Sequence, residues 1–200
     1  MIREATPTDF ETLRTIERAA GEMFRSIGMG EIADDQPASD PELLPFVESG
    51  TAWVETDSED RPIAYLLLEQ LDVLEQFDGL EQLDALEQFD GLEQFDRPAH
   101  IQQVTVHPAH ARRGIGAALI DTADRWAHQQ RLSGLTLTTF AEVPWNAPYY
   151  SRLGFKILPE EEWTTGLRQR FVREAEAGLD AWQRVIMLRE HRQRMSTGNP

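Results

Sequence analysis

Two arginines and two glycines stand together in the run Arg112-Arg113-Gly114-Ile115-Gly116. Glycine has no Cβ, so neighbouring backbone N–H groups can approach an anion closely, and arginine adds charge-assisted hydrogen bonds. The first turn of a helix also presents free N–H groups and a partial positive charge. If a helix begins at this point, the segment is a phosphate-binding loop that needs no metal.

The flanking sequence predicts the elements that would hold this loop. Residues 101–106 favour a strand, and an amphipathic helix is expected over 114–130, with its apolar residues on one face (Ile115, Leu119, Ala123 and Trp126). A dinucleotide-binding loop would have a third glycine where Leu119 stands, and a P-loop requires Gly-Lys-Ser/Thr. Neither signature is present, so the phosphate ligand is of another kind.

The rest of the chain predicts a mixture of strands and helices. Further strands are expected over 2–5, 51–56, 63–68, 135–140, 155–158 and 184–188. Helices are expected from Thr6 onward through an apolar stripe that ends at Phe24, and over 40–47, 147–153 and about 160–177. Residues 28–38 are expected to form a polar, acidic loop.

Residues 68–96 form a six-residue repeat, with four full copies of LEQ[LF]D[VGA] and a partial fifth copy. The repeat holds ten acidic residues and no basic one, so ten of the 16 net negative charges lie there and the other 171 residues carry −6. Apolar residues at every third position make no stable helical stripe. We expect an expansion between two adjacent strands, as an extended hairpin or a loop. An acidic surface for self-association or for a basic partner is the alternative.

Composition excludes several classes of protein. The chain has no cysteine, which excludes disulfides, thiolate zinc sites and a cysteine acyl-enzyme. A net charge of −16 argues against nucleic acid as the main ligand. No apolar run approaches the twenty or so residues of a membrane span, and the N-terminus lacks a signal-peptide pattern. We therefore expect a cytoplasmic protein.

Three segments together resemble the GNAT (GCN5-related) N-acetyltransferase superfamily. They are QVTVHPAHARRGIGAALI at 103–120, FAEVPWNAPYYSRLGF at 140–155 and IREATPTDF at 2–10. The resemblance implies an α/β (α+β) fold, with a mixed, mostly antiparallel sheet flanked by helices. It predicts one domain over 1–190, interrupted by the repeat, and a flexible tail over 191–200. One departure is Ala111, which stands where the family usually has Gln or Arg.

The resemblance also implies a reaction, in which acetyl-CoA transfers its acetyl group directly to an amine. Backbone groups of Val104, Thr105 and Val106 would pair with the pantetheine arm. The residues expected to hold the pyrophosphate are Arg112, Arg113, Gly114, Ile115, Gly116 and Ala117. Asn146 would bind the pantetheine near the thioester, and Tyr150 would protonate the thiolate, unless it only packs in the core. Relatives often carry a glutamate on the strand at 101–106, but Gln102 and Gln103 stand here.

Without a strand glutamate, Glu142 is the candidate general base, with a solvated loop carboxylate as its alternative role. His107 and His110 lack a third clear ligand, so no metal is expected.

The acceptor is expected to be a small-molecule or protein amine. Its pocket would lie between residues 23–45 and 140–145, and nearby acids favour a cation (Glu22, Glu31, Asp34 and Asp35). Trp53 and Trp145 line this pocket or fill the core. The sequence does not determine the oligomeric state, and a homodimer is one of the alternatives. The alternative function is a non-catalytic acyl-CoA-binding regulatory module.

Overall fold

Seven strands form one sheet in the part of the chain that the structure, a computed structural model, describes, residues 1–70 and 98–191. Their order is β1-β2-β3-β4-β5-β7-β6, and every neighbouring pair is antiparallel except β4–β5. The strands are β1 (Ile2–Glu4), β2 (Ala52–Thr56), β3 (Pro62–Gln70), β4 (Ala99–Val106), β5 (Gly134–Phe140), β6 (Lys156–Ile157) and β7 (Arg184–Glu190).

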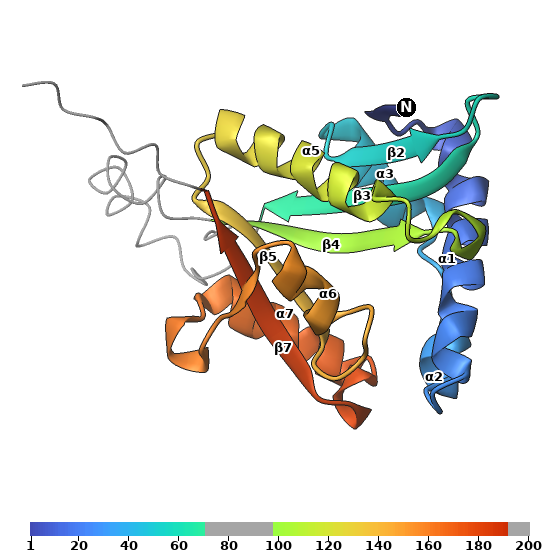
Figure 1. Cartoon of the computed structure of the whole chain (residues 1–200). Helices are drawn as coiled ribbons and strands as arrows, with labels where there is room; N and C mark the ends of the chain where they lie inside the picture. Colours follow the sequence, from blue (N-terminus) through green and yellow to red (C-terminus); the bar gives the residue numbers. More distant parts are fainter. Residues whose placement is uncertain (71–97, 192–200) are drawn as a thin grey trace, which may run out of the picture.

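The parallel pair β4–β5 divides the sheet. Only Ala99, His100 and Ile101 of β4 have partners on β5, although β4 continues to Val106 and β5 to Phe140. A bulge at Gln102 accompanies the separation, because Leu67 pairs with Gln103 while Leu68 pairs with Ile101. Beyond Ile101 the two strands are no longer paired and diverge (Figure 1), and we call this unpaired stretch, 102–106 of β4 and 138–140 of β5, the β4–β5 opening.

Alternating side chains of the central strands build a core on each face of the sheet. On one face, Leu66 and Ile101 pack with Leu119 and Ala123 of α5 (Ile115–Gln129). On the other face, Leu67 packs with residues of α1 (Phe10–Arg25) and α3 (Asp40–Glu48). Helix α5 therefore crosses one side of β2–β4, and α1 lies on the other side (Figure 1). The period-2 alternation of the strands separates the two cores.

An aromatic cluster joins the N-terminal helices to the end of β5. Phe24 of α1 contacts Phe140 and Trp145, with ring centroids 5.8 and 5.6 Å apart, and Met29 is buried among them. Helix α2 (Gly30–Ala33) packs against α1 and adds Ile32. The cluster therefore connects the α1 side of the molecule with the β5 side of the opening.

Half-buried ion pairs attach helix α7 (Thr165–Glu176) to the sheet. Arg170 pairs with Glu69 of β3 and with Glu174, whose other oxygen accepts a 2.7 Å hydrogen bond from Arg184 of β7. The guanidinium of Arg184 also lies over the ring of Phe171, 4.2 Å from its centroid. Helix α6 (Ala147–Arg152) lies between β5 and β6 in the sequence and completes the C-terminal half.

The structure differs from the sequence-based expectation in three places. Residues 28–38, expected to be a loop, contain α2, and the single helix expected over 160–177 is a 3-10 turn (Glu160–Glu162) followed by α7. The break falls at Thr164, whose hydroxyl caps the new helix by accepting from the Leu167 N–H. The late strand expected over 155–158 has only two residues, Lys156–Ile157.

Two expectations lie outside the described residues. They concern the conformation of the repeat, which begins inside β3 at Leu68 and continues past residue 70, and the tail, of which only His191 is described. Of the helices in the described parts of the chain, none has the length and apolar character that crossing a membrane requires.

Candidate active site

Six consecutive backbone N–H groups, those of residues 112–117, have no acceptor within the described ranges 1–70 and 98–191. The first intrahelical bond of α5 comes only at Ala118, whose N–H donates to the Gly114 carbonyl. Unpaired donors at a helix N-terminus carry a partial positive charge. A helix therefore begins at the predicted loop and presents a row of free donors, an arrangement that is suited to binding an anion.

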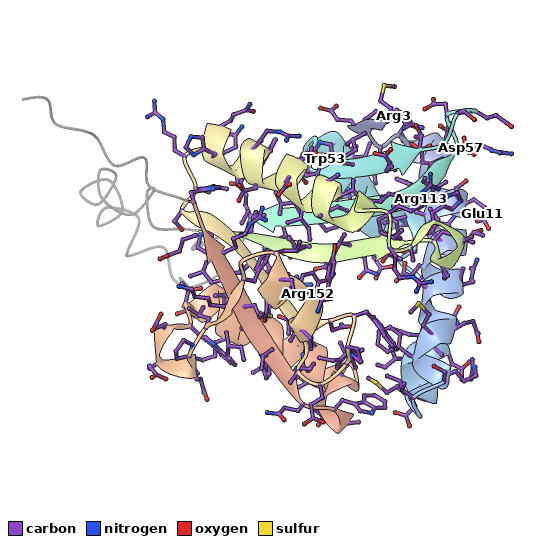
Figure 2. The ribbon with its side chains drawn as sticks, in the orientation of Figure 1. Arg3, Glu11, Trp53, Asp57, Arg113 and Arg152 are labelled. Atoms are coloured by element: carbon purple, nitrogen blue, oxygen red, sulfur yellow. The ribbon has the colours of Figure 1, made fainter. Side chains whose placement is uncertain are left out.

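Left-handed backbone conformations shape this row of donors. Gly114, the N-cap of α5, has φ 80°, and Arg112 has φ 60°. Both arginines are exposed, and Figure 2 shows Arg113 beside the N-terminal end of α5. Gly116 is needed for a different reason: a Cβ at this position would lie 2.9 Å from the Tyr149 hydroxyl. The two glycines thus serve backbone conformation and close packing respectively.

The two histidines support the loop. His107 accepts a 3.2 Å hydrogen bond from the Ala109 N–H, and His110 Nδ1 lies 3.2 Å from an Arg113 nitrogen. Their rings meet edge to face with centroids 5.9 Å apart. Over the described residues, no group of three or more His, Cys, Asp or Glu side chains is arranged to hold a metal. The histidines therefore have a structural account that involves no metal.

Strand β4 presents backbone groups to the β4–β5 opening. The His107 N–H donates to the Ile63 carbonyl of β3, and backbone groups point alternately to the two sides of a strand. The N–H and C=O groups of Val104 and Val106 therefore face the opening, whereas those of Thr105 face β3. An extended ligand in the opening would pair with Val104 and Val106 as an added strand.

Asn146 lies at the β5 side of the opening, just before α6. Its side-chain N–H donates a 2.8 Å hydrogen bond to the Thr139 hydroxyl, and its carbonyl accepts from the N–H groups of Tyr149 and Tyr150. These bonds fix Asn146 at the start of α6 and orient the tyrosine pair. The amide oxygen of the Asn146 side chain accepts no hydrogen bond from the described residues, so a ligand N–H can use it.

Tyr150 combines packing with a free hydroxyl. Its ring lies 5.4 Å from Tyr149 and 5.9 Å from Phe155, centroid to centroid, against the core on the α5 face. Burial, and then the neighbouring Tyr149, raise the pKa of Tyr150 above its usual value. The phenol therefore keeps its proton at neutral pH. No partner for this hydroxyl occurs among residues 1–70 and 98–191.

The predicted general base, Glu142, lies on the protein surface. Glu142 is exposed, in the bend that follows β5, and makes no hydrogen bond or ion pair with the described residues. On β4, Gln102 is exposed at the bulge, and Gln103 donates a 2.8 Å hydrogen bond to the Thr105 hydroxyl. The β4 positions near the opening thus carry neutral side chains.

The two segments expected to form the acceptor pocket meet in the aromatic cluster. The cluster includes Trp145, whereas Trp53 is buried on the α5 face, with its ring 6.1 Å from that of Trp126. The expected negative charge is partly neutralised, because Arg25 pairs with both Glu22 and Asp34. The aromatic cluster therefore characterises this region better than the acidic surface does.

One carboxylate that sequence reasoning missed lies between α1 and the face of the sheet that α1 covers. Glu17 of α1 accepts a 2.8 Å hydrogen bond from the hydroxyl of Tyr65, a residue of β3 that is 1% exposed. The signal was its spacing: Phe10, Leu13, Glu17, Ala20 and Phe24 follow the 3–4 spacing of one helical face. An acid in a stripe of apolar residues marks a carboxylate that points toward the sheet.

Comparison with known proteins assigns the family. The Acetyltransferase (GNAT) family model matches residues 13–155. The fold, with its divided sheet and free helix N-terminus, is that of this class, and the chain belongs to the GNAT acetyltransferase family.

Solved structures share the fold at low sequence identity. The Rv2747 protein of Mycobacterium tuberculosis, in complex with CoA and NLQ, is 16% identical with a TM-score of 0.60, covering 96% of this chain and 99% of that one. A GNAT-family acetyltransferase of Listeria monocytogenes is 13% identical with a TM-score of 0.60, covering 96% and 94%.

N-acetylglutamate synthase of Neisseria gonorrhoeae, complexed with coenzyme A and N-acetyl-glutamate, has a TM-score of 0.62 at 15% identity. It covers 96% of this chain, which matches only 35% of that longer protein. At these identities the likeness concerns the fold alone.

Proposed function

We propose that this protein transfers an acetyl group from acetyl-CoA to a primary amine, in a ternary complex and without an acyl-enzyme. The observation that carries the proposal is the row of free N–H groups at 112–117, next to a strand whose Val104 and Val106 face an opening. One ligand with a pyrophosphate and an extended amide arm matches both features. Solved relatives of the same fold hold coenzyme A.

Different residues around the opening bind different parts of acetyl-CoA. The side chains of Arg112 and Arg113 and the backbone N–H groups of 112–117 bind the pyrophosphate, and Val104 and Val106 pair with the pantetheine amides. Asn146, held by Thr139, accepts a hydrogen bond near the thioester. The amine nitrogen attacks the thioester carbon directly, and the absence of cysteine from the chain agrees with a reaction that forms no acyl-enzyme.

Tyr150 supplies the proton for the leaving sulfur. When the C–S bond breaks, the electron pair stays on sulfur, and the phenol donates its proton to give the free thiol. The proton lost by the new amide nitrogen returns the phenol to its neutral form through solvent. General acid assistance of this kind is worth about 10²–10⁴-fold.

A thiol-release assay tests the proposal. Purified protein is mixed with acetyl-CoA and each of a panel of amines: 2-phenylethylamine, cadaverine, lysine and a short peptide with a free N-terminus. We expect amine-dependent release of thiol above the uncatalysed rate for at least one class. Tight binding of acetyl-CoA by calorimetry, with no thiol release across the panel, would instead support the non-catalytic acyl-CoA-binding module.

A further inference from the structure

Glu17 occupies the sheet face opposite that of Tyr150. Tyr150 packs with the core on the α5 face, whereas Glu17 projects from α1, which packs on β3 and β4 from the other side. Between the two faces lies β4, which has no partner on β5 beyond Ile101. A proton donor and a carboxylate therefore lie on opposite faces of the sheet, and each packs against the side of the sheet that contains β4.

The position of Glu17 is fixed from β3 and β4. The Tyr65 hydroxyl donates to Glu17 Oε2 at 2.8 Å. Tyr65 is directly paired with Thr105 of β4, and Thr105 accepts a hydrogen bond from Gln103. The side chains of Tyr65, Gln103 and Thr105 share this face, so a polar path leads from Glu17 to the strand that lines the opening.

One oxygen of Glu17 is left for a ligand. Within residues 1–70 and 98–191, no donor pairs with Oε1, and this atom is not one of the buried polar atoms that lack a partner. Solvent or a ligand can therefore reach it. Further along the same face of α1, Phe24 contacts Phe140 and Trp145 in the aromatic cluster.

The surroundings of Glu17 favour proton uptake. Burial raises the pKa of the Glu17 carboxyl, the Tyr65 hydrogen bond opposes this rise, the charge of Asp35 adds to it, and Arg18 opposes it. A base with a raised pKa holds a proton more firmly than an exposed glutamate does.

We propose that Glu17 binds the ammonium group of the acceptor and takes its proton, the role that Gln102 and Gln103 cannot fill. The inference rests on the acetyl transfer proposed above. One N–H bond of the ammonium breaks and the proton goes to Oε1, directly or through one water, which leaves a free electron pair on nitrogen for the thioester carbon. Glu17 later releases this proton to solvent. Tyr65 is a positioning residue that holds the carboxylate.

Substitution of Glu17 by glutamine tests this role. Glu17→Gln keeps an oxygen that can accept from Tyr65 but removes the base. We expect kcat/KM for the amine to fall by about 10²–10⁴-fold near neutral pH, with wild-type affinity for acetyl-CoA by calorimetry. Because the free amine becomes abundant as the pH nears its own pKa of about 10, the deficit should shrink between roughly pH 7 and pH 9.5.

Three further variants separate chemistry from structure. Glu11→Gln changes an exposed glutamate on the same helix and should match the wild type. Glu17→Asp should recover part of the lost rate, and Tyr65→Phe should lose less than Glu17→Gln. The wild-type rate tests the proposed acetyl transfer, while the ratio of variant to wild-type rates tests Glu17. A Glu17→Gln protein with the wild-type kcat/KM, or with a deficit that does not change with pH, would overturn the inference.

Discussion

The left-handed conformation of Gly114 offers a test of the phosphate loop. Gly114 has φ 80°, and no atom lies within 4 Å of the position a Cβ would take. Replacement by alanine therefore meets no steric obstacle, and its cost is conformational. Placing an L-residue in this region costs about 1–2 kcal/mol.

Because the loop is exposed, we expect this cost to reduce ligand affinity and not the folding stability of the free protein. Arg112, Arg113 and Gly114 are all exposed, so the free protein can relax the loop and relieve the strain. Binding of acetyl-CoA then has to restore the left-handed geometry. Since 1.4 kcal/mol is tenfold in an equilibrium constant, Gly114→Ala should raise the Kd for acetyl-CoA by about five- to thirtyfold.

Isothermal titration calorimetry measures this Kd, and Gly50→Ala is the matched control. Gly50 has φ 69° and likewise has no atom near the Cβ position, but it lies in the turn between α3 and β2. The control should lose a similar 1–2 kcal/mol of folding free energy, or roughly 2–8 °C in Tm, with an unchanged Kd. A folded Gly114→Ala protein that binds acetyl-CoA as the wild type does would refute the proposed role of this loop.

Three other outcomes are expected. Tyr150→Phe should lower kcat by about 10²–10⁴-fold while leaving acetyl-CoA affinity unchanged; a variant with full kcat would leave Tyr150 a packing residue only. Arg184→Ala removes a cation with a side chain 3% exposed that pairs with Glu174, so a melt should show a loss of about 3–5 kcal/mol, whereas Arg168→Ala, in an exposed pair, should lose no more than about 1 kcal/mol. Burial, and then Arg170, lower the pKa of His100 to about 3, so the unfolded chain binds more protons between about pH 3 and pH 6.5. The free energy of unfolding should therefore decrease as the pH is lowered through that window, by up to about 1.4 kcal/mol per pH unit. Denaturant titrations should find this dependence reduced in His100→Asn.

Local sequence rules accounted for the phosphate loop. Glycines at 114 and 116, next to a helix with a regular apolar face, left few alternative structures, and α5 begins at Ile115, one residue after its predicted start. The Asn146 to Phe155 segment was similarly informative, because it contains a helix start, an aromatic pair and a glycine with φ 91° at its end. Features set by neighbouring residues in the chain were therefore predictable.

Features set by distant contacts were not. The partner of Glu17 is Tyr65, 48 residues away, and no local pattern indicates that pairing. Helix α2 forms in a polar segment because Met29 and Ile32 join the aromatic cluster. The division of the sheet depends on how far β4 and β5 pair, which follows from the packing of two half-sheets and not from either strand alone.

The short pairing of β4 with β5 has a consequence for the folding stability of the protein. Three residue pairs join two half-sheets, so a ligand that hydrogen-bonds to Val104 and Val106 becomes part of the sheet itself. A ligand at a hundred times its Kd adds about 2.7 kcal/mol to folding stability. Under the proposed function, substrate acetyl-CoA and product CoA would make the same backbone contacts. The folded lifetime of the enzyme would then follow the total coenzyme A supply, whatever its state of acetylation.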